Sequence, residues 1–190
     1  MSLMVHPFRL SLVYLSFAAF CCGIPLLNAQ KFEVFDNLEQ LQARINRAGD
    51  TTLVINFWAT WCKPCVEELP CFDELRDNYD SPNLQILLVS LDFKSQLDKK
   101  FVPLLKNQQI KSEVALMADQ DFDAWIPYIS AEWDGAIPAT FVFKGKKRRF
   151  NLGKFENLEE LEAFVRPFVT DSAFFLGKKT VEGDLAGTKK

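Results

Sequence analysis

Two cysteines separated by two residues, Cys62 and Cys65, are the side chains of this sequence best suited to chemistry. The apolar run at 53–58 before them is typical of a buried strand, and residues 66–79 after them favour a helix. At a strand-to-helix turn such a pair can close a disulfide and open it again. Unpaired N–H groups and the dipole at a helix start stabilise a thiolate on the first cysteine. The spacing therefore predicts dithiol–disulfide exchange.

Two other readings of the pair are a zinc half-site and a disulfide-stapled turn without turnover. A structural zinc site needs four ligands, usually cysteine or histidine. The only histidine is His6, which lies in an N-terminal segment that we expect to be removed. Outside that segment Cys71 is the one further cysteine, so three thiols would remain. Ligand supply thus disfavours zinc.

Residues 1–29 have the features of a secretory signal peptide. Arg9 gives a positive start, and residues 10–22 form an uncharged, mostly apolar core. That core is shorter than the roughly 20 residues that a membrane span needs. We expect cleavage after the small residue Ala29, with an uncleaved anchor or a lipid on one of the segment's cysteines as alternatives. The predicted location is the periplasm or the outside of the cell.

Composition limits the remaining function classes. Residues 30–169 suit one domain, with 48% hydrophobic residues in the whole chain, and residues 170–190 are predicted to be a flexible polar tail. Cleavage would remove the only histidine, which excludes Cys–His and Ser–His–Asp catalysis within the mature chain. The net charge of −3 and the lack of a basic stripe argue against nucleic acid as a partner. Export would also place the cysteines where disulfides persist.

The pattern along the chain predicts alternating strands and helices. Strands are expected at 32–35, 53–58, 84–93 and 114–118, followed by a hairpin at 140–144 and 147–152. Helices are expected at 38–48, at 66–79 with an interruption at Pro70, at 95–109, at 122–129, and after a capping residue at Asn157. This order predicts an α/β sandwich with a central mixed sheet.

The segment NFWATWCKPC at 56–65 resembles thioredoxin-fold proteins of the extracytoplasmic TlpA and ResA type. Glu68 and Pro70 follow at the spacing of that group, AIPAT at 136–140 matches its cis-proline turn, and residues 95–118 match its helix–strand insertion. The resemblance covers residues 32–168. It implies a thioredoxin-like sandwich with helices on both faces of the sheet. Plain thioredoxin differs, since it has a buried aspartate where Asn56 stands here.

The cysteines and their neighbours receive distinct expected roles. Cys62 is the nucleophile, because the helix start and the charge of Lys63 both lower a thiol pKa. Cys65 is expected to be the more buried, resolving thiol. Glu68 lies three residues further on the same helix face and could exchange a proton with Cys65; an exposed surface glutamate is the alternative. Glu67 is expected to be merely solvated.

The resemblance also implies a surface for substrate. A cis peptide at Ile137-Pro138 would place Ile137 against the disulfide, where its backbone could pair with an extended client segment. Trp61 is expected to pack beside the disulfide and shape the docking surface, with ordinary core packing as the alternative.

Other side chains near this surface are more ambiguous in the sequence. Trp125, Tyr128 and Trp133 could add an aromatic wall to the docking surface or could pack in the core. Cys71 is expected to be a buried helix cysteine, and a third redox thiol is the less favoured reading.

The resemblance implies an exported thiol–disulfide oxidoreductase that reduces protein disulfides through a mixed disulfide. It implies that no metal or organic cofactor is needed. It also implies protein clients, a membrane electron donor and a monomeric state. One rival is a thiol peroxidase, which needs a Pro-x-x-x-Thr/Ser-x-x-Cys setting; the segment before Cys62 lacks that proline. The other rival is a binding module whose disulfide serves only structure.

Overall fold

The computed structural model describes residues 31–79 and 82–169. At its centre lies a six-stranded sheet in the order β1-β4-β3-β2-β5-β6. The strands are β1 (Glu33–Phe35), β2 (Thr52–Trp58), β3 (Leu84–Ser90), β4 (Glu113–Met117), β5 (Ala139–Lys144) and β6 (Lys147–Leu152). The first four run parallel, whereas β5 is antiparallel to β2 and β6 to β5. The predicted mixed sheet is confirmed.

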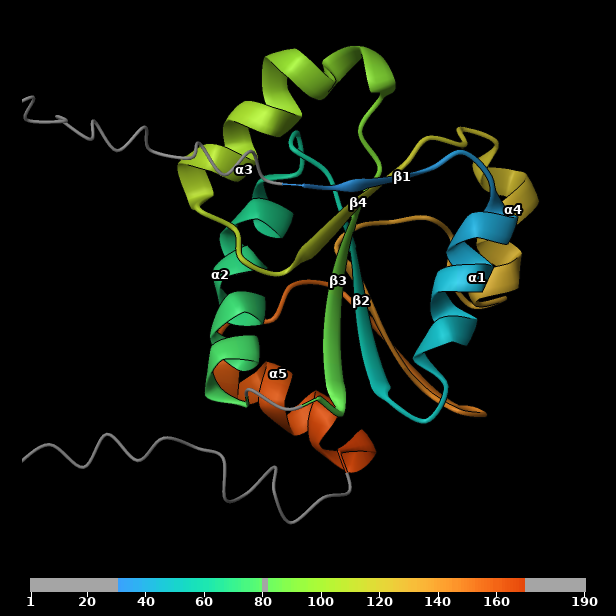
Figure 1. The fold of residues 1–190 in the computed structure, drawn as a ribbon, viewed down its shortest axis with the longest axis vertical. Coiled ribbons are helices and arrows are strands. Elements are labelled where there is room, and N and C mark those ends of the chain that lie inside the picture. The colour runs from blue at the N-terminus through green and yellow to red at the C-terminus, as the bar shows by residue number, and fades with distance from the viewer. Residues whose placement is uncertain (1–30, 80–81, 170–190) are drawn as a thin grey trace, which may run out of the picture.

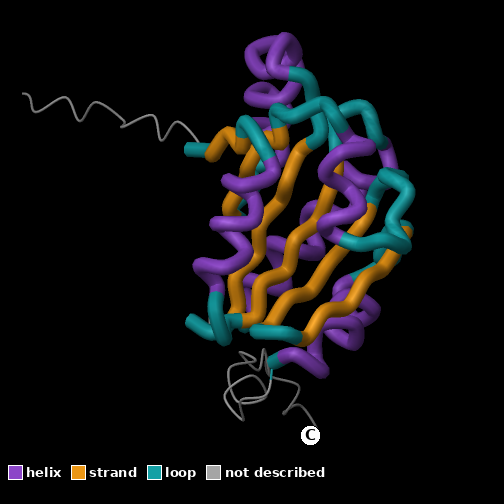
Figure 2. Tube along the Cα trace, turned by 90° about the vertical axis from the view of Figure 1, so that its right-hand side faces the viewer, coloured by secondary structure: helices purple, strands orange, loops and turns teal. Residues whose placement is uncertain are grey.

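Helices cover both faces of this sheet. Figure 1 shows α1 (Leu38–Ala48) and α4 (Phe122–Ile129) on one face, and α2 (Lys63–Asn78) and α5 (Leu158–Val165) on the other. The short α3 (Val102–Gln108) lies beyond the upper end of α2 in that view. Figure 2 shows the strands side by side between the two helical layers. Within residues 31–79 and 82–169, no helix is long and apolar enough to cross a membrane.

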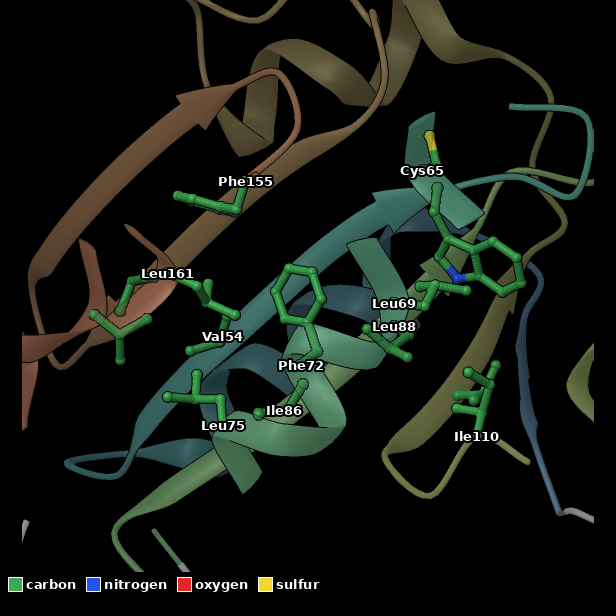
Figure 3. Packing of buried hydrophobic residues seen from close by; sticks show 14 of the residues in the cluster. Val54, Cys65, Leu69, Phe72, Leu75, Ile86, Leu88, Ile110, Phe155 and Leu161 are labelled. Atoms are coloured by element: carbon green, nitrogen blue, oxygen red, sulfur yellow. The ribbon is translucent and has the colours of Figure 1, made fainter. Parts of the chain in front are cut away.

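Strand β2 is the centre of the core, and all of its residues are buried. Leu53, Ile55 and Phe57 belong to the apolar cluster beneath α1 and α4. Val54 and Trp58 belong to the cluster beneath α2 and α5. Figure 3 shows part of this second cluster, with side chains from α2, β2, β3 and α5 in contact. A strand that is buried on both faces has a continuous apolar sequence, and this pattern predicted β2 correctly.

Side chains fix the starts of two helices. The Asn37 side chain accepts a hydrogen bond from the Gln40 N–H at 3.1 Å and begins α1. Asn157 accepts from the Glu160 N–H at 3.0 Å and begins α5, as predicted. These bonds satisfy N–H groups that have no partner within the helix.

Two helical predictions need correction. Helix α2 begins at Lys63 rather than at residue 66 and continues through Pro70. The segment expected as one helix at 95–109 is divided into a 3₁₀ turn (Lys94–Gln96), a wide π turn (Leu97–Phe101) and α3. Pro103 accounts for the division, because it has no N–H to bond the carbonyl four residues earlier. The predicted signal peptide (1–29) and tail (170–190) lie outside the described residues.

Candidate active site

Cys62 and Cys65 form a disulfide at the N-terminus of α2, just beyond the carboxyl end of β2. Cys62 is the residue that caps the helix, and its Sγ accepts a hydrogen bond from the Cys65 N–H at 3.3 Å. Cys62 is 6% exposed, whereas Cys65 is fully buried. The two sulfurs therefore occupy an outer and an inner position, and the outer one has a hydrogen-bond donor ready for a negative charge.

The predicted cis peptide at Ile137-Pro138 is confirmed. The Ile137 carbonyl oxygen lies 3.8 Å from the Cys62 Sγ, so this turn directly adjoins the outer sulfur. Trp61, the residue before Cys62, is 61% exposed. Core packing of Trp61 is thereby excluded, and its ring forms part of the surface around the disulfide.

Glu68 is 1% exposed, so the alternative of a surface glutamate is wrong. Its carboxylate accepts two hydrogen bonds, from the Asn56 amide at 2.8 Å and from the Phe155 N–H at 2.9 Å. Burial raises the pKa of Glu68 to about 7, although both hydrogen bonds and the charge of Lys154 act in the opposite direction. A carboxyl group with this pKa can both give and take a proton near neutral pH.

Asn56 ties this carboxylate to the sheet. It points from β2 toward α2, and its amide also donates to the Thr140 hydroxyl on β5 at 3.1 Å. Asn56, Glu68 and Thr140 are all buried. The amide therefore fixes Glu68 without supplying a second carboxylate of its own.

The charges around Lys63 are more closely paired than the sequence suggested. Glu67 is not merely solvated, because its carboxylate lies 3.7 Å from the Lys63 ammonium and 3.4 Å from that of Lys154. The Lys63 side chain is 88% exposed. Water and Glu67 both screen its charge, so the helix start is the stronger source of thiolate stabilisation at Cys62.

Asp92 is a site residue that the sequence analysis missed. It is fully buried just after β3 and accepts hydrogen bonds from the Thr60 N–H at 2.9 Å, the Thr60 hydroxyl at 2.7 Å and the Ser90 hydroxyl at 2.7 Å. These bonds hold the loop that leads into Cys62. A signal was present, because an aspartate ends the apolar run of a strand parallel to β2, and parallel strands end at the same edge of a sheet.

Of the two alternatives for the aromatic residues of α4 and the following loop, core packing holds for the two tryptophans. Trp125 and Trp133 are buried and pack on Phe57, with ring centroids 6.0 and 4.6 Å away. Tyr128 is exposed, but it lies beside α1 residues such as Gln42 and away from the disulfide. The core alternative is correct for Trp125 and Trp133, since the large apolar residues of β2 require cover on this face, whereas Tyr128 takes neither predicted position.

Cys71 is half-buried and unpaired rather than fully buried. It lies six residues after Cys65, which turns it away from the helix face that carries Cys65, Glu68 and Phe72 into the core. Burial, and then the nearby charges of Glu74 and Glu68, raise the pKa of this thiol.

Comparison with known proteins identifies a family. Residues 27–148 match the model of the AhpC/TSA family. The chain is 29% identical over 140 residues to the thiol-disulfide oxidoreductase ResA of Bacillus cereus, covering 73% of this chain and 75% of that protein. It is 37% identical over 88 residues to ResA of Bacillus thuringiensis subsp. konkukian, covering 46% and 49%.

Solved structures give the same fold. A thiol:disulfide interchange protein of Chlorobium tepidum, 24% identical, superposes with a TM-score of 0.52 over 64% of this chain and 82% of that one. A thioredoxin-related protein of Neisseria meningitidis, 20% identical, gives a TM-score of 0.52 over 63% and 86%. The predicted thioredoxin-like sandwich is thus confirmed.

Proposed function

This chain belongs to the AhpC/TSA family of thioredoxin-like proteins, and we propose that it is an exported thiol–disulfide oxidoreductase that reduces disulfides in client proteins. One observation carries the proposal: an outer sulfur and a buried sulfur share a disulfide at a helix start, beside a cis-proline turn. A disulfide that served only structure would not require this helix-start position or the adjoining turn.

The reaction would proceed in two exchanges. The Cys62 thiolate attacks one sulfur of the client disulfide, which forms a mixed disulfide and releases the other client sulfur as a thiolate. Cys65 then gives up its proton and attacks the Cys62 Sγ, which releases the second client thiolate. The client gains two electrons and becomes a dithiol, and the protein is left with the disulfide seen in the structure.

Glu68 is our candidate for the proton acceptor of the second exchange. Cys65 is fully buried, so bulk water does not contact its thiol and the proton needs an acceptor nearby in the protein. Glu68 lies on the same helix face, and its pKa of about 7 suits proton exchange at neutral pH. We assign it to the resolving step, and not to the first attack by Cys62.

The partners follow from this chemistry. An extended client segment would pair with the backbone at Ile137 and Pro138, and Trp61 would flank it. Each turnover consumes two electrons, and we propose that a membrane-bound dithiol supplies them. We also propose that the protein works as a monomer. Removal of residues 1–29 would place the protein in the periplasm or outside the cell; an intact mass that begins at Gln30 would support this, and retention of the segment would contradict it.

Trapping tests the proposed function. A Cys65→Ala variant should accumulate a stable mixed disulfide through Cys62 when it is reduced and mixed with a disulfide-bonded protein, since the resolving thiol is missing. Cys62→Ala should form none, and Cys71→Ala should turn over as the wild type does. Rapid consumption of hydrogen peroxide without client reduction would favour the peroxidase reading, and a disulfide that no dithiol can reduce would favour the binding module.

A further inference from the structure

A cavity of about 200 Å³ opens beside the disulfide, between the loop that carries Trp61 and helix α4. Leu91, Phe122, Ile126 and Ile137 line it with apolar surface, and the exposed ring of Trp61 forms one wall. Such a lining fits an aliphatic chain about as long as that of lysine or norleucine.

The hollow is maintained by a glycine. Gly135 has a φ of +89°, and a Cβ atom at this position would lie 2.8 Å from the Ile126 Cδ1. A larger residue would therefore strain the backbone and clash with Ile126, which also lines the cavity.

Two carboxylates, Asp123 and Asp134, stand at this cavity. Both residues are exposed, and the Asp134 carboxylate also accepts the Ala136 N–H at 3.0 Å. In the part of the chain that the structure describes, neither forms an ion pair with a lysine or arginine. The sequence contains no basic residue from 112 to 143, so no nearby cation of this segment offsets their charge.

The cavity and the reacting sulfur share a residue. Ile137 lines the cavity, and its carbonyl oxygen lies 3.8 Å from the Cys62 Sγ. An extended chain advances about 3.3 Å per residue. A client segment bound over Ile137 would therefore place a side chain in the cavity from a position within about three residues of the attacked cysteine.

We infer that this cavity, which we call the Trp61 pocket, selects client disulfides that are flanked by a lysine or arginine. The inference rests on the proposed function, since it names the client feature that the same site recognises. The aliphatic stem of the client residue packs on the apolar lining, and its cationic head lies between the two carboxylates and against the Trp61 ring. An acidic client residue would meet repulsion, and an uncharged one would gain only the apolar contact.

Synthetic peptide disulfides provide the test. Peptides identical except for one residue would carry lysine, norleucine or glutamate at each of the three positions on either side of the attacked cysteine. Reduction by stoichiometric reduced protein would be followed by acid quench and mass spectrometry. At one or more positions the wild type should reduce the lysine peptide about five- to tenfold faster than the norleucine peptide, as a surface ion pair and a cation–π contact together allow. Glutamate should be slowest.

Matched variants locate the effect. Asp123→Asn combined with Asp134→Asn should bring the lysine-to-norleucine ratio close to one, whereas Glu39→Gln combined with Glu159→Gln removes two exposed carboxylates elsewhere and should keep the ratio. High salt should also reduce the ratio in the wild type. Equal rates for all peptides, or a lysine preference that survives in the Asp123/Asp134 variant, would overturn the inference that the Trp61 pocket selects basic client residues. Reduction of no peptide at all would instead overturn the proposed function, and the pocket with it.

Discussion

At the scale of single residues, the two cysteines differ because of what surrounds each sulfur. The Cys62 Sγ accepts a hydrogen bond from the Cys65 N–H and Cys62 is 6% exposed, while Cys65, in the first turn of α2, is fully buried. Lys63 contributes less than the sequence suggested, because it is exposed and paired with Glu67. The asymmetry of the pair is therefore built mainly by the backbone of the helix start.

This asymmetry predicts the order of alkylation. When the protein is reduced and treated with iodoacetamide at mildly acidic pH, Cys62 should be labelled first, because the helix start stabilises its thiolate and Cys65 is fully buried. Peptide mapping after short reaction times measures the order. The half-buried Cys71, whose pKa is raised, serves as the internal comparison. Faster labelling of Cys65 or Cys71 would contradict the assignment of the nucleophile.

A second prediction at this scale concerns Glu68. Glu68→Gln removes the proton acceptor next to the resolving thiol, so mixed disulfides should accumulate while the first attack stays largely unchanged. General acid–base assistance contributes about 10²- to 10⁴-fold, and a resolving step slowed within or somewhat below that range is expected. In the wild type the resolving rate should rise through pH 7, where Glu68 ionises, and this rise should vanish in the variant.

Stopped-flow reduction of a protein disulfide across pH separates the two exchanges. Glu67→Gln is the matched control, because it neutralises the neighbouring, half-exposed carboxylate on the same helix. If both variants resolve mixed disulfides as fast as the wild type, Glu68 has a structural role only.

At the scale of elements, the best predictions were for segments whose own residues determine where the strand or helix begins and ends. The apolar run of β2 and the capping asparagine of α5 located their elements to within one or two residues. The prediction of one continuous helix over this part of the chain, residues 94–108, was wrong, because Pro103 alters the hydrogen bonding of the turn before it. The partner of Asp92 is equally hidden, since Thr60 is 32 residues away in sequence.

Within the site, sequence could identify the cysteines and the cis-proline turn but not the burial of their neighbours. The buried carboxylate of Glu68 is satisfied by Asn56 and by the N–H of Phe155, which lies far along the chain. Trp125 is buried because β2 presents Phe57 to it. Both outcomes depend on contacts between distant segments, which spacing along one helix does not reveal.

Asp92 gives a prediction for the loop between β2 and α2. Asp92→Asn replaces one accepting oxygen by an NH₂ group, so at least one hydrogen bond from Thr60 or Ser90 loses its acceptor, which should cost about 1–3 kcal/mol of unfolding free energy. The Thr60 amide should also lose protection from hydrogen exchange, because its acceptor is weakened. Disulfide reduction should slow as the loop into Cys62 loosens.

Chemical denaturation and amide exchange measured by NMR test this role. Asp98→Asn is a suitable control, because it removes an exposed carboxylate from the π turn that follows Asp92 in the chain. A Thr60 amide that exchanges equally slowly in Asp92→Asn and the wild type would show that Asp92 does not hold this loop.

At the scale of the whole molecule, the active site and the core are one structure. The hydrogen-bonded set of Asn56, Glu68 and Thr140 joins β2, α2 and β5 in the layer that also holds the largest apolar cluster. Function therefore places a titratable group inside the core, and the stability of the entire fold must respond to its protonation.

The resulting prediction is a fall in stability with rising pH that belongs to Glu68. Burial raises its pKa from 4.5 to about 7 in the folded protein, so between these values the unfolded chain ionises while the folded one keeps its proton. The contribution of protonated Glu68 to the unfolding free energy is full below pH 4.5 and falls as the pH rises. It is lost once the pH exceeds about 7. A shift of this size corresponds to a loss on the order of 3 kcal/mol.

Denaturant unfolding of the oxidised protein from pH 4 to 8 measures this loss, since the closed disulfide keeps Cys62 and Cys65 from titrating. Glu68→Gln should be less stable than the wild type at low pH, because its NH₂ group faces a donor from Asn56 or Phe155. Its unfolding free energy should nevertheless lack the decline attributed to Glu68, so the two curves should converge or cross as the pH rises. Glu67→Gln should decline in parallel with the wild type. If Glu68→Gln also runs parallel to the wild type over the whole range, the carboxyl group keeps an ordinary pKa in the folded protein and cannot serve as the proton acceptor near neutral pH.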